Sequence, residues 1–106
     1  MVAWIVLVIA GVLEAVWATA LGKSEGLTKL TPTVIFIVAL IASMIGLAYA
    51  MRTLPTGTSY AVWVGIGAVL TVGYAMLTGM ESVSLLKIAL LLVIVAGIVG
   101  LKLLHD

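Results

Sequence analysis

Long apolar runs separated by short polar breaks divide this sequence into four segments. The breaks lie at Gly22–Gly26, Thr53–Gly57 and Gly79–Ser82, and each combines glycine with hydroxyl or charged residues, as loops do. The segments between them lack the alternation of β-strands, and each has the roughly 20 residues that cross a 30 Å hydrocarbon core. We therefore predict an all-α integral membrane fold. It is a single transmembrane domain over residues 1–106, with four helices at about 2–22, 32–51, 58–78 and 83–104.

The composition supports this interpretation and excludes other classes of protein. Of the 106 residues, 65% are hydrophobic and 8% are charged, whereas soluble domains have about 25% charged residues. The net charge of +1 offers no basic surface for nucleic acid, and the absence of cysteine excludes disulfides and thiolate chemistry. The sequence shows no nucleophile–base pair, metal-ligand cluster or phosphate-binding loop. We therefore expect no enzyme, no cofactor and no metal site.

The basic residues do not choose an orientation in the membrane. With a cytoplasmic N-terminus, Arg52 and Lys102 would lie inside, and Lys23, Lys29 and Lys87 would lie outside. The positive-inside rule requires a larger difference in the number of Lys and Arg residues between the two sides. Two interpretations stay open from charge alone: one weakly determined topology, or insertion in both orientations followed by antiparallel pairing.

Glu14 is the strongest candidate for a functional residue. It interrupts the apolar segment Val2–Leu21, which carries no other charge. A carboxylate near the bilayer centre costs about 2.5–3.5 kcal/mol on insertion scales, and such groups usually mark ion pathways, proton relays or ligand counter-ions. The structural alternative is an acid paired with a buried Lys or Arg, and the sequence places no basic residue at membrane depth. We therefore expect Glu14 to bind protons or a cation.

The first two helices supply further candidates. Trp17 lies one helical turn from Glu14, and its indole N–H can donate to a carboxylate. Ser43 is the polar member of a small-residue stripe on the second helix that also contains Ala39 and Gly46. Such stripes let helices approach closely in lipid. Taken alone, Ser43 is expected to bond back to a carbonyl of its own helix.

The third and fourth helices carry aromatic and small residues. Tyr60, Trp63 and Gly67 share a face of the third helix, where an inward aromatic pair favours cation binding over plain packing. Gly65 and Gly67 are expected to weaken this helix and permit a kink. On the fourth helix, the pattern Ala96-x-x-x-Gly100 suits helix association, so we expect it to pack a dimer.

Over nearly its whole length the chain resembles the small multidrug resistance transporters. Any one of the matching motifs is weak alone, but their order within four spans is specific. The motifs are Ala10-Gly11-x-x-Glu14-x-x-Trp17-Ala18, Ser24-x-Gly26-x-Thr28-x-Leu30-x-Pro32, Leu54-Pro55-x-Gly57-Thr58-x-Tyr60-Ala61-Val62-Trp63-x-Gly65-Ile66-Gly67 and Gly97-Ile98-x-Gly100-Leu101-Lys102.

The resemblance implies an antiparallel, dual-topology dimer in the bacterial inner membrane that exchanges protons for small cations. It favours a homodimer, with a heterodimer of paralogues as the alternative. Glu14 would be the shared proton and substrate site, lined by Trp17, Ser43, Tyr60 and Trp63. Two facing Glu14 carboxylates would titrate as a coupled pair during alternating access.

Within this family, Trp17 resembles the guanidinium-exporting subtype, whereas the quaternary-ammonium subtype usually has glycine at that position. One departure leaves selectivity open, because Val64 stands where a hydroxyl residue is expected after Trp63. The alternatives are an exporter of hydrophobic quaternary ammonium drugs and, in other classes, a passive pore or a structural membrane subunit.

Overall fold

The computed structural model describes residues 1–105, and this part of the chain folds into four helices, each long and apolar enough to cross a membrane. This confirms the predicted all-α membrane fold. The helices are α1 (Val2–Lys23), α2 (Leu30–Ala50), α3 (Thr56–Leu77) and α4 (Leu85–His105).

Helix α1 starts at the predicted residue, whereas α2, α3 and α4 start about two residues from the predicted positions, and the residues at each start account for the difference. Pro32 lies within the first turn of α2, where its missing N–H costs no hydrogen bond. Pro55 is the N-cap of α3, so the helix begins directly after it rather than at residue 58. At α4, the Ser84 hydroxyl accepts a hydrogen bond of 3.0 Å from the Lys87 backbone N–H and so delays the start to Leu85.

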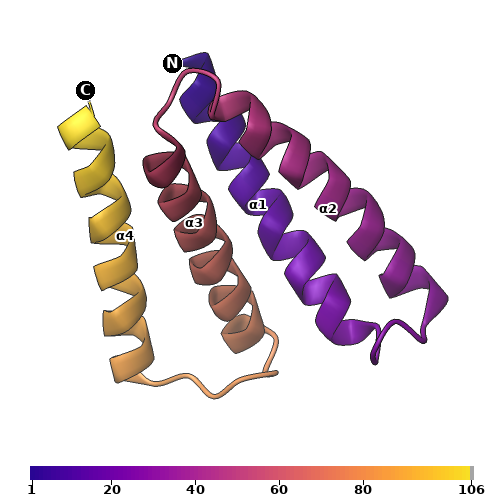
Figure 1. The fold of residues 1–106 in the computed structure, drawn as a ribbon. Coiled ribbons are helices and arrows are strands. Elements are labelled where there is room, and N and C mark those ends of the chain that lie inside the picture. Colours follow the sequence, from indigo (N-terminus) through magenta and orange to yellow (C-terminus); the bar gives the residue numbers. More distant parts are fainter. Residues whose placement is uncertain (106) are drawn as a thin grey trace.

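The helices run alternately up and down, with α1 between α2 and α3, and α4 beyond α3 (Figure 1). The start of α1, the α2–α3 loop and the end of α4 lie at one end of the molecule, and the other two loops lie at the opposite end. Helix α1, called the central helix below, packs against both α2 and α3, and α4 packs against α3.

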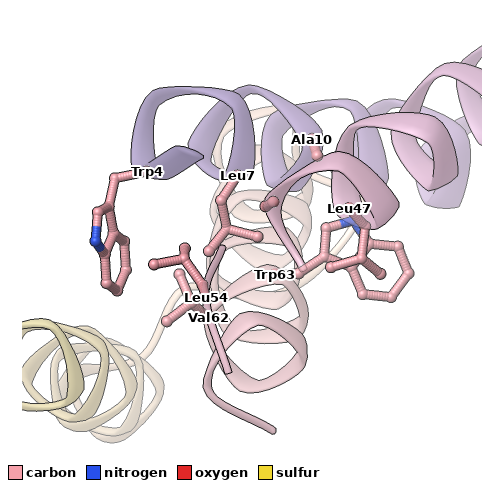
Figure 2. Packing of buried hydrophobic residues seen from close by; sticks show 8 residues of the cluster. Trp4, Leu7, Ala10, Leu47, Leu54, Val62 and Trp63 are labelled. Atoms are coloured by element: carbon pink, nitrogen blue, oxygen red, sulfur yellow. The ribbon is translucent and has the colours of Figure 1, made fainter. Parts of the chain in front are cut away.

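An apolar cluster holds α1, α2 and α3 together near the end that contains the α2–α3 loop. Figure 2 shows Leu7 of α1, Val62 of α3 and Leu54 of the α2–α3 loop grouped together, with Trp4 nearer to α4. Leu7 and Val62 are almost completely buried. Burial of side chains between the helices replaces lipid contacts with closer protein contacts, which is what drives association within a bilayer.

Small residues set how closely the helices approach. A Cβ atom on Gly11 would lie 2.8 Å from the Cβ of Ile66, so α1 and α3 meet where Gly11 has no side chain. A Cβ on Gly46 would lie 3.0 Å from that of Ala10, which brings α2 against the neighbouring face of α1. These contacts bring both neighbours of α1 close to the segment that contains Glu14.

Helix α4 is the least covered element. Within residues 1–105, no side chain in its apolar span is buried. Ala96 is exposed, and a Cβ on Gly100 would meet nothing described within 4 Å. On the opposite face of the same helix, about 200° around from Gly100, the Lys102 ammonium lies 5.2 Å from the centre of the Trp4 ring. The face that carries Ala96 and Gly100 is thus free for another helix, and the dimer contact stays a prediction.

Candidate functional site

Glu14 lies in the middle of α1, with its carboxylate against α3. A Cβ atom built on Gly67 would overlap this carboxylate, so the acid rests on the bare backbone of α3. Its Oε1 atom is buried, and no group in residues 1–105 donates a hydrogen bond to it. An unpaired buried oxygen is costly, and in membrane proteins such an acid is typically functional.

The carboxylate has no basic partner in the described part of the chain. The ion pairs found there are Lys29–Glu25 and Lys87–Glu81, both between exposed side chains in or next to the loops. Residues 1–105 thus supply no basic partner for Glu14, and its role in binding protons or a cation stays a prediction.

The Ser43 hydroxyl on α2 forms hydrogen bonds to both α1 and α3 near Glu14. It is completely buried and donates a hydrogen bond of 2.7 Å to the Ala10 carbonyl oxygen on α1. It also accepts a hydrogen bond of 3.0 Å from the indole N–H of Trp63 on α3. The expectation that Ser43 bonds back to its own helix was therefore wrong, because the close approach of α1 offers a carbonyl from another helix.

Aromatic rings from three helices form a row one turn away from Glu14 and Gly67. The ring centroids are 6.0 Å apart for Phe36–Trp17, 6.4 Å for Trp17–Trp63 and 6.0 Å for Trp63–Tyr60. These separations lie within the range of favourable aromatic contacts. The structure thus brings three of the predicted lining residues, Trp17, Trp63 and Tyr60, into one continuous row.

The aromatic residues of this row differ in whether their polar groups already form hydrogen bonds. Trp63 is buried, and its indole N–H donates a hydrogen bond to the Ser43 hydroxyl. The indole N–H of Trp17 is buried and has no acceptor among residues 1–105, so the expected bond to Glu14 is not formed. Tyr60 is 56% exposed, so much of its side chain lies at the surface of this chain. Trp17 and Tyr60 are therefore the members of the row with polar groups left to bind a ligand.

Phe36 is a member of the row that the sequence analysis missed. It is the one phenylalanine in the chain and precedes Ser43 by seven residues, which places both on the same face of α2. Its ring meets Trp17 edge-on, at an interplanar angle of 67°. The heptad spacing to Ser43 was the signal that could have identified it.

The two glycines expected to permit a kink in α3 both allow close packing. Helix α3 continues without a break through both of them. A Cβ on Gly65 would lie 2.7 Å from Cδ1 of Ile98 on α4, and Gly67 leaves room for the Glu14 carboxylate. A kink at these positions during function stays a prediction.

Val64 does not disturb the hydrogen bonds at the site. Its side chain packs against the apolar cluster, and the link from Trp63 through Ser43 to Ala10 forms without any group from Val64. The missing hydroxyl at this position therefore leaves the connection between the three helices intact.

Comparison with known proteins identifies related chains over almost the entire length. The family described as Small Multidrug Resistance protein matches residues 2–94. A guanidinium exporter of Yersinia pseudotuberculosis is 55% identical over 101 residues, covering 95% of this chain and 97% of the relative. A guanidinium exporter of Escherichia coli is 53% identical over 104 residues, covering 94% of this chain and 95% of the relative.

We expect Gly67→Ala to destabilise the protein through its contact with Glu14. The added Cβ would overlap the carboxylate and force it away from α3, at a cost of about 1–3 kcal/mol, typical of overpacking. Unfolding followed by circular dichroism in mixed micelles would measure this loss. In a Glu14→Ala background the same substitution should cost nothing, because the carboxylate is gone.

Gly73→Ala is the matched control on the same helix, since a Cβ there would meet nothing described within 4 Å. It should leave stability unchanged or raise it by up to about 1 kcal/mol through helix propensity. An equal loss of stability from both glycine substitutions would contradict the contact between Gly67 and Glu14.

We expect Ser43→Ala to weaken the connection between α1, α2 and α3. It leaves the buried Trp63 N–H without its acceptor, which should lower the free energy of unfolding by about 1–3 kcal/mol. Combining it with Trp63→Phe should cost less than the sum of the two single changes, since both remove the same bond. Thr33→Val is a suitable control, because its hydroxyl donates to a carbonyl four residues back in the chain. Strict additivity of Ser43→Ala and Trp63→Phe would show that their hydrogen bond contributes nothing.

Proposed function

Because the chain belongs to the small multidrug resistance family, we propose that it is a proton-coupled exporter of small guanidinyl cations. The observation that carries this proposal is the Glu14 carboxylate, with a buried oxygen that lacks both a donor and a basic partner in residues 1–105. The names of the relatives, which are guanidinium exporters, support the choice of substrate.

The chemistry of the site suits a guanidinium ion. This planar cation has N–H groups in a fixed fork that can pair with both oxygens of a carboxylate. Its flat face stacks on aromatic rings, which the row around Trp17 and Tyr60 supplies. Glu14 would bind the charge, and the aromatic residues would hold the ion flat and exclude water.

Coupling to protons follows from competition for the same oxygens. When Glu14 is ionised it binds the cation, and when it is protonated it has no charge to hold it. Protons that enter from the more acidic side therefore release the substrate on that side, and removal of protons on the other side lets Glu14 bind the next cation. No ionisable residue other than Glu14 is needed for this exchange.

We propose that the working unit is an antiparallel homodimer in the bacterial cell membrane, with two Glu14 carboxylates facing one another. Two features support this assembly: the small difference in Lys and Arg between the two ends, and the uncovered α4 face around Ala96 and Gly100. In such a dimer the inward- and outward-facing states can be the same structure seen from opposite sides. Pairing with a paralogue is the alternative, and it would leave the role of Glu14 unchanged.

We expect Glu14→Gln to abolish proton-coupled transport, because the amide neither binds a proton near neutral pH nor carries a charge that attracts a cation. Purified protein in liposomes should give substrate-evoked currents and proton movement only with the native acid. Glu25→Gln is the matched control, since Glu25 is an exposed acid whose partner is Lys29. Its transport should stay at the native level, since exposed pairs contribute about 0–1 kcal/mol. Retained coupled transport by Glu14→Gln would overturn the proposal, and a steady conductance without exchange would indicate a passive pore.

We expect guanidinium and its small substituted forms to evoke larger currents than tetraalkylammonium ions in the same liposomes. A tetraalkylammonium ion has no N–H to pair with Glu14, and its bulk prevents flat stacking in the aromatic row. Currents recorded at matched concentrations across such a panel would measure the preference. Larger currents from tetraalkylammonium ions would instead identify a quaternary ammonium exporter, and no current from any cation would favour a structural subunit.

A further inference from the structure

A groove runs along the face of α1 that points away from Glu14. Val12, Val16 and Thr19 of α1 form its floor, Ile35 of α2 forms one wall, and Leu70 and Tyr74 of α3 form the other. Its volume is about 470 Å³. Glu14 stands two residues from both Val12 and Val16, so it projects about 200° away from them around the helix. The groove is therefore separate from the proposed transport site.

The groove is mostly apolar, with Thr19 and Tyr74 as its hydroxyl residues and one cation at its end. Lys23, the last residue of α1, lines the groove at the level of the loops. Its ammonium lies 3.5 Å from the Tyr74 hydroxyl and 5.4 Å from the centre of the Tyr74 ring. Directly after Lys23, the Ser24 hydroxyl donates to the Leu21 carbonyl and accepts from the Leu27 N–H, which fixes this end of the helix.

Lys23 is also the basic residue at this end of the molecule without an acid beside it. The other two lysines here form ion pairs, Lys29 with Glu25 and Lys87 with Glu81. In the described part of the chain, Lys23 contacts no carboxylate. The positive charge left at this end is therefore concentrated at the mouth of the groove.

From this arrangement we infer that the groove binds one acyl chain of an anionic phospholipid, with the lipid phosphate at the Lys23 ammonium. Val12 lies about 16 Å along the helix axis from Lys23, which is the depth of one leaflet in a core of roughly 30 Å. An apolar chain of that length with an anion at its outer end matches both the lining and the charge. Tyr74 would hold the lysine over the groove and donate its hydroxyl to the same phosphate.

Lipid titration followed by native mass spectrometry tests this site in the intact, delipidated protein. The probes are phosphatidylglycerol and phosphatidylcholine with identical acyl chains. The native protein should retain phosphatidylglycerol with about a fivefold preference, as expected for one basic residue near the surface. Lys23→Gln should reduce the preference to about one, and Lys23→Arg should restore it. Val16→Trp fills the groove from its floor, so it should reduce retention of both lipids.

The control for charge is Lys87→Gln, which removes the same charge at the same end but outside the groove, and it should keep most of the preference. Equal losses in Lys87→Gln and Lys23→Gln would mean a diffuse surface charge and would overturn the proposal. Competition by glycerophosphoglycerol, the headgroup without acyl chains, would show that an anion binds alone and would also overturn it. A change of oligomeric state in Val16→Trp would assign the groove to a second copy of the chain.

Discussion

The hydroxyl of Ser43 is the point through which α1, α2 and α3 are held around Glu14. It donates to a backbone carbonyl of α1 and accepts from an indole of α3, so one side chain of α2 fixes the relative position of all three. Water would compete for such bonds at the surface of a soluble protein, but a completely buried hydroxyl in a bilayer meets no such competitor. The position of Trp63 follows from this bond. Through it, the positions of Trp17 and Tyr60 in the aromatic row also follow.

The central helix has two faces with different chemistry, and its neighbours determine the difference. On one face, Gly67 leaves its backbone open so that the Glu14 carboxylate can lie against α3. On the opposite face, Val12 and Val16 lie at the bottom of an apolar groove that ends at Lys23. An acid and a base on the same helix thus remain far apart, about 14 Å along its axis. This separation keeps Lys23 from neutralising Glu14, as the proposed binding of a cation at that acid requires.

The sequence predicted the helices and the central acid because both depend on local information. Hydropathy alone marks four spans, and a lone charge within one of them is visible without any structure. The partners of these residues were harder to predict because they depend on the positions of helices distant in sequence. Ser43 bonds to a carbonyl 33 residues away, and no local pattern gives the vertical alignment of two helices. Gly67 illustrates the same limit, since its missing side chain was visible but the carboxylate that occupies the space was not.

Unpaired polar atoms give the proposed second subunit stronger support than uncovered apolar surface does. An uncovered apolar helix such as α4 requires no protein partner in a bilayer, because lipid chains are as apolar as its side chains. A buried carboxylate oxygen on Glu14 and a buried indole N–H on Trp17 are different, since lipid can satisfy neither and residues 1–105 leave both unpaired. In the proposed dimer, either group would have to become accessible to the second protomer or to the bound cation before it could be paired, because both atoms are buried within this chain. The exposed surface of Tyr60 fits the same proposal, because a side chain at the surface of one protomer would line the cavity between two.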